Sequence, residues 1–407
     1  MTRPSSRRLD LEGLLEAVEN APPFAAAGVI SQRLGETLGA SDVSFLIADF
    51  SGRSLIRLGH PPPGDPTVKD RETAERVPLD GTPSGRALAT QTVGVETGSD
   101  RTRVFAPVTN RGDAIGVLEL SLVDRPDEAT VADVALAAHA LAYVIIANRR
   151  FTDLFEWGQR TVPLSLAAEI QHRLLPPSYT CEGGQFTLAG WLEPAGDVAG
   201  DTFDFAMERD TLHLSLTDAM GHDVSAALLA TVLVGALRGA RRAGSPLGEQ
   251  AMRASDELAA NAVEGAFVTG QVARIDLRAG TAEIVNAGHP PPLRLRAGRV
   301  EPVRLHADPP FGTIPGHRYR VQRLSLDPGD RLMFFTDGII ERNTTEVDLE
   351  ATLTASADMH AREAVQHIIH AILRATDGAL NDDATALCVD WHGGPERERT
   401  SDSGADV

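Results

Sequence analysis

The chain has 407 residues, a formal net charge of −19, 42% hydrophobic residues and 5% aromatic residues. This length predicts two or three domains with aliphatic cores, and the negative charge argues against non-specific nucleic-acid binding and against docking on an anionic membrane. Cys181 and Cys388 stand far apart, and no apolar segment follows the polar start Met1–Asp10, so we expect a cytoplasmic protein with reduced thiols and no signal peptide. The longest apolar runs, near Val134–Ala147 and Ala226–Leu237, are too short to span a bilayer and are expected to be buried helices.

The first 150 residues show helical and strand patterns in turn. Helical spacing over Leu9–Leu38 is interrupted at Pro22-Pro23, which predicts two helices. The other expected elements are strands at Ser44–Asp49, Ser54–Leu58, Arg103–Val108 and Ala114–Val123, a loop at Pro61–Asp70, and helices at Pro83–Thr90 and Glu128–Arg149. Asn110-Arg-Gly-Asp113 is typical of a hairpin turn between the last two strands.

Residues 151–177 are predicted to form a helical connector. Val162, Leu166, Ile170 and Leu174 recur every four residues on one helix face. Pro163 either starts the helix in its first turn or kinks a longer one. Two interpretations stay open: the helix packs on its own domain, or it pairs between two chains and carries a signal.

The rest of the chain alternates strands and turns between Phe186 and Trp391. The expected strands are Phe186–Glu193, a hairpin from Asp201 to Asp218, Val268–Leu277, Thr281–Asn286, Leu293–Arg296, Arg299–Leu305, Tyr319–Leu326, Arg331–Phe335 and Thr385–Trp391, with helices at Val224–Arg242, Leu247–Val263 and Ala361–Thr376. This order predicts two packed antiparallel sheets with helices outside. The tail 393–407 is polar and expected to be disordered.

Acidic residues stand at the ends of the predicted strands. The hairpin brings Asp201 and Asp218 to its open end, where adjacent carboxylates are tolerated best with a cation between them. Asp337 and the pair Asp382-Asp383 flank two further strands. Carboxylates without clustered Cys or His favour Mg²⁺ or Mn²⁺, and two such ions can activate water and hold a phosphoryl group.

Each of these acids also has a structural interpretation. Asp337-Gly338 alone favours a turn, Asp382-Asp383 alone favours a solvated acid pair, and Asp218 could cap the following helix, although Asp223 suits that role better. Asn286–His289 is predicted to be a tight structural turn whose histidine is a hydrogen-bonded core residue.

Residues 10–150 resemble a GAF-type sensor domain. The resemblance rests on Val104-Phe-Ala-Pro-Val108, Ala114-Ile-Gly-Val-Leu118 and Pro78-Leu-Asp-Gly81. It implies an antiparallel sheet with helices and a small-molecule ligand, whose identity no Cys or His pair indicates. Another antiparallel α+β domain is the alternative.

Residues 165–391 resemble the SpoIIE-type branch of the metal-dependent PP2C phosphatases. Eight motifs occur in the family's order: Glu193-Pro-Ala195, Gly200-Asp201 with Asp204, Asp218-Ala-Met-Gly-His222, Phe267-Val-Thr269, Asn286-Ala-Gly-His-Pro290, Pro310-Phe-Gly312, Phe335-Thr-Asp-Gly-Ile-Ile-Glu341 and Asp382-Asp-Ala-Thr385. Ala168–Pro177 resembles the segment before the catalytic domain in that family, which favours the signalling interpretation of the connector.

The resemblance implies a two-ion Mn²⁺ or Mg²⁺ site, residue by residue. Asp218 would bridge both ions, and the backbone carbonyl of Ala219 would bind one of them. Asp337 and one acid of Asp382-Asp383 would complete the other, with Asp382 preferred as the direct ligand but Asp383 left open. Asp201 would ligate an ion or hold a water bound to it. Asp201, Asp218 and Asp337 are thus the candidate catalytic residues.

Three positions depart from the family pattern. Ala199 and Thr202 stand where Gly and an aromatic residue are usual, and Asp223 stands where Gly is usual. None of these changes removes an expected ligand, so we expect an active enzyme.

The predicted organisation is α+β throughout: a GAF-like sensor (1–150), a helical linker (151–177), a PP2C-like α-β-β-α sandwich (178–392) and the disordered tail. The resemblance implies a serine/threonine protein phosphatase that uses metal-activated water. We expect this protein to be cytoplasmic, and we hypothesise that it forms a homodimer through residues 151–175. Its substrate would be a phosphorylated regulatory protein of the anti-sigma-factor-antagonist type, and the sensor would regulate it. Two alternatives stay open: a catalytically weak phosphatase-like scaffold, and a small-molecule sensor that acts through partner binding.

Overall fold

The chain divides into two compact units. The structure, a computed structural model, describes residues 9–50, 52–58, 74–161, 163–194, 200–221, 223–263, 265–339, 347–378, 380–394 and 404–405. The first unit comprises Met1–Pro163 together with Arg399–Val407, and the second comprises Leu164–Glu398. The predicted domain limits at residues 150, 177 and 392 stay predictions.

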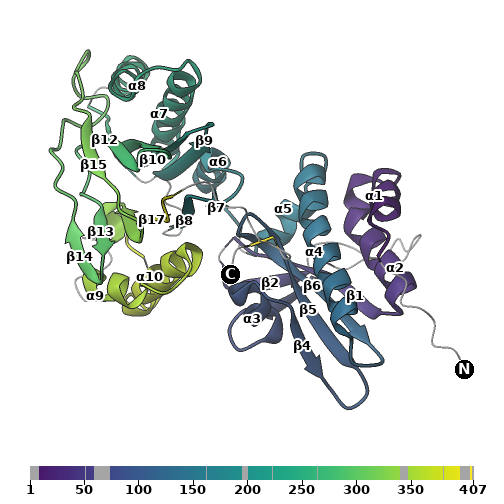
Figure 1. Ribbon diagram of the computed structural model, residues 1–407. Helices are drawn as coiled ribbons and strands as arrows, with labels where there is room; N and C mark the ends of the chain where they lie inside the picture. The colour runs from purple at the N-terminus through teal and green to yellow at the C-terminus, as the bar shows by residue number, and fades with distance from the viewer. Residues whose placement is uncertain are drawn as a thin grey trace, which may run out of the picture. The chain divides into compact units, whose positions relative to one another are not determined.

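The first unit is built on a six-stranded antiparallel sheet in the order β3-β2-β1-β6-β5-β4 (Figure 1). Its strands are β1 Ser41–Ala48, β2 Ser54–Arg57, β3 Glu75–Pro78, β4 Gly94–Thr97, β5 Thr102–Asn110 and β6 Asp113–Leu122. Phe45 and Ile47 face a large core, while Leu46 between them faces a smaller one. Side chains that alternate across the pleat therefore give the sheet two apolar faces.

Helices cover both faces of this sheet. They are α1 Leu11–Glu19, the 3₁₀ turn Pro23–Ala25, α2 Ala26–Leu38, α3 Pro83–Thr90, α4 Glu128–Asn148 and α5 Leu154–Gln159. Residues of α1, α2, α4 and α5 enter the large core, and Ala87 and Leu88 of α3 enter the smaller one. The predicted break at Pro22-Pro23 is confirmed, since proline lacks the amide that a continuous helix needs there.

The hairpin turn between β5 and β6 is confirmed as well. Asn110 lies opposite Asp113, and the two loop residues Arg111 and Gly112 have φ angles of 50° and 78°. Positive φ at both loop residues matches the right-handed twist of the paired strands. The two short edge strands β3 and β4 were not predicted, and the predicted loop at residues 61–70 lies outside the described residues.

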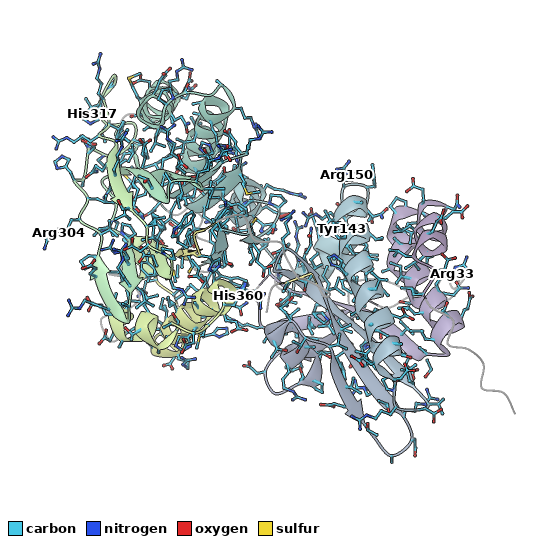
Figure 2. All side chains as sticks on the ribbon, viewed as in Figure 1. Arg33, Tyr143, Arg150, Arg304, His317 and His360 are labelled. Carbon is cyan, nitrogen blue, oxygen red and sulfur yellow. The ribbon has the colours of Figure 1, made fainter. Side chains whose placement is uncertain are left out.

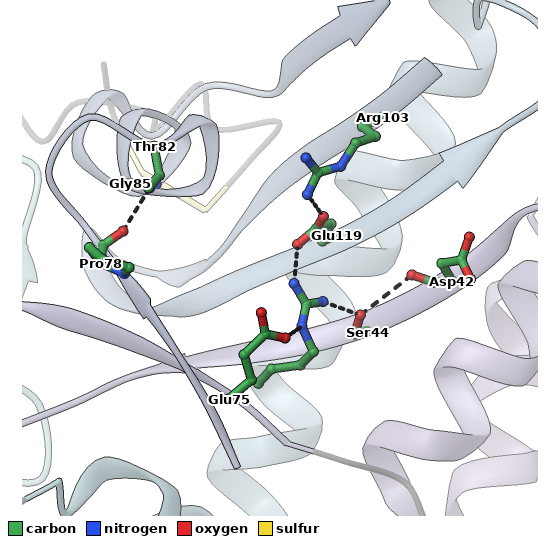
Figure 3. Close-up of polar contacts among 9 residues, drawn as sticks. Asp42, Ser44, Glu75, Pro78, Thr82, Gly85, Arg103 and Glu119 are labelled. Atoms are coloured by element: carbon green, nitrogen blue, oxygen red, sulfur yellow. Dashed lines mark hydrogen bonds and ion pairs between the residues drawn. The ribbon is translucent and has the colours of Figure 1, made fainter. Parts of the chain in front are cut away.

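A buried charge network crosses the smaller-core face of the sheet (Figure 3). Glu119 on β6 is 5% exposed and accepts hydrogen bonds from Arg57, at 3.0 Å, and from Arg103. Arg57 also donates to Ser44, at 2.6 Å, and to Glu75, at 2.8 Å. The carboxylate is tolerated at this depth because both of its oxygens have charged donors.

The second unit contains two antiparallel sheets packed face to face. The five-stranded sheet has the order β15-β12-β11-β10-β9, and the six-stranded sheet has the order β14-β13-β16-β17-β8-β7. Their strands are β7 Thr180–Glu182, β8 Phe186–Glu193, β9 Asp201–Met207, β10 Thr211–Ala219, β11 Val268–Asp276, β12 Thr281–Ala287, β13 Leu293–Arg296, β14 Arg299–Pro302, β15 Gln322–Ser325, β16 Asp330–Phe335 and β17 Ala384–Trp391. Leu216 of β10, Phe334 of β16 and Leu387 of β17 share the core between the sheets.

Helices form the outer layers of this unit. α7 Val224–Arg242 and α8 Leu247–Asn261 pack on the five-stranded sheet, and α9 Leu349–Ala355 and α10 Ala361–Ala375 pack on the six-stranded one (Figure 1). The layer order of helices, sheet, sheet and helices agrees with the predicted sandwich. α9 was not predicted from the sequence.

The connector differs from its prediction. Its second helix, α6, spans Leu166–Leu174, and the Ser165 side chain caps its first turn at Ala168 N. Pro163 therefore precedes the helix, and both predicted roles for it were wrong, because the serine cap starts the helix further on. Buried Ala167 packs with Ala227 of α7, which supports packing on its own unit. Val162 lies outside the described residues.

The two apolar runs form helices longer than the runs themselves. α4 has 21 residues and α7 has 19, and both are long and apolar enough to cross a membrane by length and composition. In the most apolar window of each, 50% and 39% of the residues are buried inside the protein. Both pack against sheets as core helices, as the sequence predicted.

We predict that Arg331→Met destabilises the second unit. The Arg331 side chain is 5% exposed and bonds Asp390 at 2.6 Å and the Met359 carbonyl at 2.5 Å. Removing one partner of a buried ion pair costs about 3–5 kcal/mol. The control Arg323→Met removes a 78% exposed side chain, for which about 0–1 kcal/mol is expected. Urea unfolding measures both, and equal losses would contradict the prediction.

Candidate functional site

The open end of the β9–β10 hairpin brings two acidic residues together, as predicted. The strand register places Asp218 directly opposite Asp201. Leu212, Leu214 and Leu216 of β10 face the core between the sheets. Because side chains alternate along a strand, Asp218 continues this inward-facing row.

Asp201 is held from the opposite sheet. Its side chain is buried, and its Oδ2 accepts hydrogen bonds from the Thr336 hydroxyl at 2.7 Å and the Thr385 hydroxyl at 2.6 Å. Thr336 follows β16 and Thr385 lies in β17, and the Thr385 amide donates to the Thr336 hydroxyl at 3.1 Å. The two threonines orient the carboxylate and join the two sheets at this end. Sequence reasoning missed both, although each lies within two residues of a predicted acid.

A glutamine of the connector reaches the same cluster. The buried Gln171 side chain donates from Nε2 to the Asp201 carbonyl at 2.9 Å and to Asp383 Oδ2 at 2.6 Å. The Gly200 amide also lies 3.4 Å from Asp383 Oδ2. Asp383 therefore points into the cluster. Gln171 was not predicted as a site residue, because nothing in its helix spacing distinguishes it from other polar residues.

The clustered carboxylates form a site that suits a cation. Burial raises the pKa of Asp201 well above its usual value, and the nearby carboxylates of Asp218 and Asp383 raise it further. The hydrogen bonds from the Thr385 and Thr336 hydroxyls lower the pKa of Asp201, but by less than burial and the neighbouring carboxylates raise it. A divalent cation would offset the repulsion among these oxygens. Among the residues that the structure describes, however, no three His, Cys, Asp or Glu side chains form a group that could hold a metal as they stand.

The backbone leaves room for a carbonyl ligand beside the acids. A Cβ on Gly200 would lie 2.7 Å from the Ala219 carbonyl oxygen, closer than real Cβ contacts allow. Gly200 and Ala219 also pair through their backbones, at 3.2 Å from the Ala219 amide to the Gly200 carbonyl. Glycine at position 200 thus keeps the Ala219 carbonyl accessible, which fits the predicted role of that carbonyl.

The remaining predicted ligands lie next to this cluster. Asp337 directly follows Thr336 and is partly buried. Asp382 is also partly buried, and its Oδ1 accepts from the Asp383 amide at 2.9 Å. The choice between Asp382 and Asp383 as direct ligand stays a prediction. The predicted motif residues Ala195, Ala199, His222, Ile340 and Glu341 lie outside the described residues.

Three other predicted residues have structural partners. Asp204 is buried and bonds Arg238 at 2.8 Å and Arg241 at 3.0 Å, so it faces α7. The Thr202 hydroxyl lies 2.6 Å from that of Thr217, which explains a threonine where the family has an aromatic residue. Asp223 accepts from the Ser225 amide at 2.8 Å and caps α7, as predicted.

His289 links three segments near the acids. Its ring is buried, with Nδ1 at 2.9 Å from the Thr269 hydroxyl and Nε2 at 2.8 Å from the Phe335 carbonyl. Since a carbonyl only accepts, Nε2 carries the proton and Nδ1 accepts from Thr269. Thr269 lies opposite Asp218 in the five-stranded sheet, and Phe335 ends β16. The prediction of a hydrogen-bonded core histidine agrees with these contacts.

Comparisons with known proteins concern mainly the second unit. Residues 208–392 match the family described as Stage II sporulation protein E (SpoIIE). The chain is 22% identical to phosphoserine phosphatase RsbU of Bacillus subtilis over 236 residues, which cover 56% of this chain and 69% of RsbU. It is 25% identical to phosphoserine phosphatase RsbP of the same species over 185 residues, which cover 44% of this chain and 45% of RsbP.

A solved structure shows a weaker likeness. The PP2C phosphatase domain of SpoIIE from Bacillus subtilis, with a fragment of its regulatory domain, is 13% identical with a TM-score of 0.46. The likeness covers 75% of this chain and 85% of that one. The family match includes Asp218, Asp337 and Asp382-Asp383 and begins after Asp201.

We predict that His289 makes the stability of the second unit depend on pH. Burial lowers its pKa to about 4, against a usual value of 6.5. Between these pH values the unfolded chain binds a proton that the folded chain does not. The contribution of neutral His289 to the free energy of unfolding is therefore fully present above pH 6.5. It is lost as the pH falls toward 4, by about 3 kcal/mol at most.

Urea unfolding of the wild type and of His289→Gln at pH 7 and pH 4.5 measures this effect. We expect a smaller difference between the two pH values in the variant, because glutamine binds no proton. His306→Gln, which replaces a half-exposed side chain, serves as the control. Identical pH dependence in the wild type and in His289→Gln would disprove the prediction.

Proposed function

We propose that the chain is a Mn²⁺- or Mg²⁺-dependent protein-serine/threonine phosphatase, and the match of residues 208–392 to the SpoIIE family supports this. The observation that supports this function is the inward-facing cluster of Asp201, Asp218 and Asp383 at one end of two packed sheets. Buried carboxylates with a raised pKa favour bound cations, and oxygen donors without Cys or His favour hard ions.

The residues have distinct roles in this proposal. Divalent ions, when bound, would supply the positive charge that lowers the pKa of water and stabilises a phosphoryl group. Asp218, the Ala219 carbonyl, Asp337 and one acid of Asp382-Asp383 would hold them. Asp201 keeps a fixed orientation because two threonine hydroxyls donate to one of its oxygens. A water nucleophile needs no Ser or Cys of the chain.

The substrate and the regulation are inferred from the relatives and from the first unit. RsbU and RsbP bear the name phosphoserine phosphatase, which supports a phosphoserine or phosphothreonine of a regulatory protein, of the anti-sigma-factor-antagonist type, as substrate. We propose that the first unit is a GAF-like sensor for a small molecule. A homodimer in the cytoplasm remains part of the proposal.

We predict that Asp218→Asn lowers p-nitrophenyl phosphate hydrolysis more than about 100-fold in Mn²⁺ buffer, because it removes charge from the shared ligand. Asp210→Asn, in the exposed turn of the same hairpin, should keep full activity. Circular dichroism should show both variants folded. Full activity of Asp218→Asn would refute the metal-dependent mechanism.

A catalytically weak phosphatase-like scaffold is the alternative that the sequence analysis leaves open. Calorimetry with Mn²⁺ discriminates between the two. Binding that is lost in Asp218→Asn and accompanied by turnover supports the enzyme, whereas absent binding, or binding without turnover, supports the scaffold.

We propose that the connector regulates the site through Gln171. Its amide bonds both the Asp201 carbonyl and the Asp383 side chain, so a shift of α6 would move two parts of the cluster together. This contact supports the signalling role of the connector without requiring α6 to leave its own unit.

We predict that Gln171→Leu weakens Mn²⁺ binding about tenfold, since a hydrogen bond to a charged group contributes about 1.5–3 kcal/mol. The control Gln250→Leu removes another buried glutamine, whose side-chain amide donates to the Ser245 carbonyl at 2.7 Å, away from the acidic cluster. Both variants should lose thermal stability, but only the first should shift the Mn²⁺ titration. Equal Mn²⁺ affinities would contradict the prediction.

A further inference from the structure

The chain returns to the first unit after it completes the second. Residues from Arg399 onward belong to the first unit, and of these the structure describes Gly404 and Ala405. Ala405 is 3% exposed, although the sequence around it is polar. Such burial is unexpected for a small residue in a polar segment. It identifies a binding position for Gly404-Ala405 on the first unit, which we call the seat.

This seat lies at the turned end of the β5–β6 hairpin and beside α4. The Gly112 amide donates to the Gly404 carbonyl at 3.1 Å. Gly112 is the second loop residue of the hairpin, between Asn110 and Asp113, which lie opposite each other. The segment thus accepts a hydrogen bond from the turn of the hairpin.

Hydrogen bonds and a ring contact hold the residues that line the seat. Thr109 is fully buried, and its hydroxyl donates to the buried Gln91 side chain. The Thr109 carbonyl lies 3.1 Å from Nδ1 of His139 on α4. The His139 ring packs edge-on against that of Tyr143, with a centroid distance of 5.1 Å. Tyr143, which is labelled in Figure 2, lies one turn further along α4. These contacts fix the carbonyl and the imidazole that border the seat.

The seat is selective for glycine at position 404. Gly404 has a φ of 93°, a conformation that residues with a side chain rarely adopt. A Cβ there would lie 2.2 Å from the Thr109 carbonyl oxygen and 2.6 Å from His139 Nδ1. The next residue must be small, because Ala405 is enclosed.

We propose that Thr109, Gly112 and His139 form a peptide-binding seat in the first unit, whose ligand is a glycine followed by a small residue, supplied by Gly404-Ala405 of the same chain. A contact made by two small residues gives little intrinsic affinity. The seat is filled because the tethered segment has an effective concentration in the millimolar range. The covalent chain thereby joins the two units a second time, in addition to the connector.

Hydrogen–deuterium exchange on the full chain tests this seat. Gly404→Val should release the segment and raise exchange at the Gly112 amide at least about tenfold, because the amide loses its hydrogen bond to the Gly404 carbonyl. The control Gly394→Val changes a glycine that also has a positive φ, of 76°, but a Cβ at that position would have no other atom within 4 Å. This control should leave exchange at Gly112 unchanged.

Rescue in trans separates a binding seat from general loosening of the fold. A synthetic peptide of residues 399–407, at millimolar concentration, should restore protection of Gly112 in the Gly404→Val chain. The same peptide with valine at position 404 should not. Unchanged exchange in Gly404→Val, or no rescue by the wild-type peptide, would overturn the proposal.

Discussion

The architecture of the second unit depends on one buried carboxylate. Asp201 extends from one sheet toward the other, where two threonine hydroxyls donate to the same oxygen. A buried charge of this kind is costly unless donors or cations surround it. Aliphatic and aromatic side chains fill most of the core between the sheets. At this end, carboxylate and hydroxyl oxygens take their place. The buried charge that destabilises the fold therefore lies at the proposed metal-binding site, where a bound cation would stabilise it.

Polar side chains hold the neighbouring segments in place around that end. His289 bridges the strand that faces Asp218 and the end of β16, and Gln171 bonds a backbone carbonyl and Asp383. On the outer side of β9, Asp204 is neutralised by two arginines of α7. Asp201 and Asp204 thus have different partners, although only two residues separate them on β9. Asp204 pairs with two arginines. Asp201 faces other carboxylates, and this group of acids suits a cation.

The sequence predicted the parts of this arrangement that are local. Hairpin register follows from strand alternation and turn residues, so Asp201 opposite Asp218 was predictable, as were the long helices and the β5–β6 turn. The hydroxyls of Thr336 and Thr385 and the amide of Gln171 were not predicted, because their partners lie far away in the chain. The start of α6 was placed too early because proline was weighted above the serine cap. The strands β3 and β4 are short and largely exposed, which leaves little apolar alternation to detect.

The seat for Gly404-Ala405 also affects the order of folding during synthesis. The hairpin and α4 leave the ribosome before the second unit is made, and domains generally fold as they emerge, from the N-terminal end. At about 5–20 residues per second, the intervening residues take on the order of tens of seconds to be translated. The first unit thus acquires its contacts with Gly404-Ala405 only after the second unit has been synthesised. Chains that have been synthesised beyond Ala405 can therefore differ from shorter nascent chains in the protection of a single hairpin.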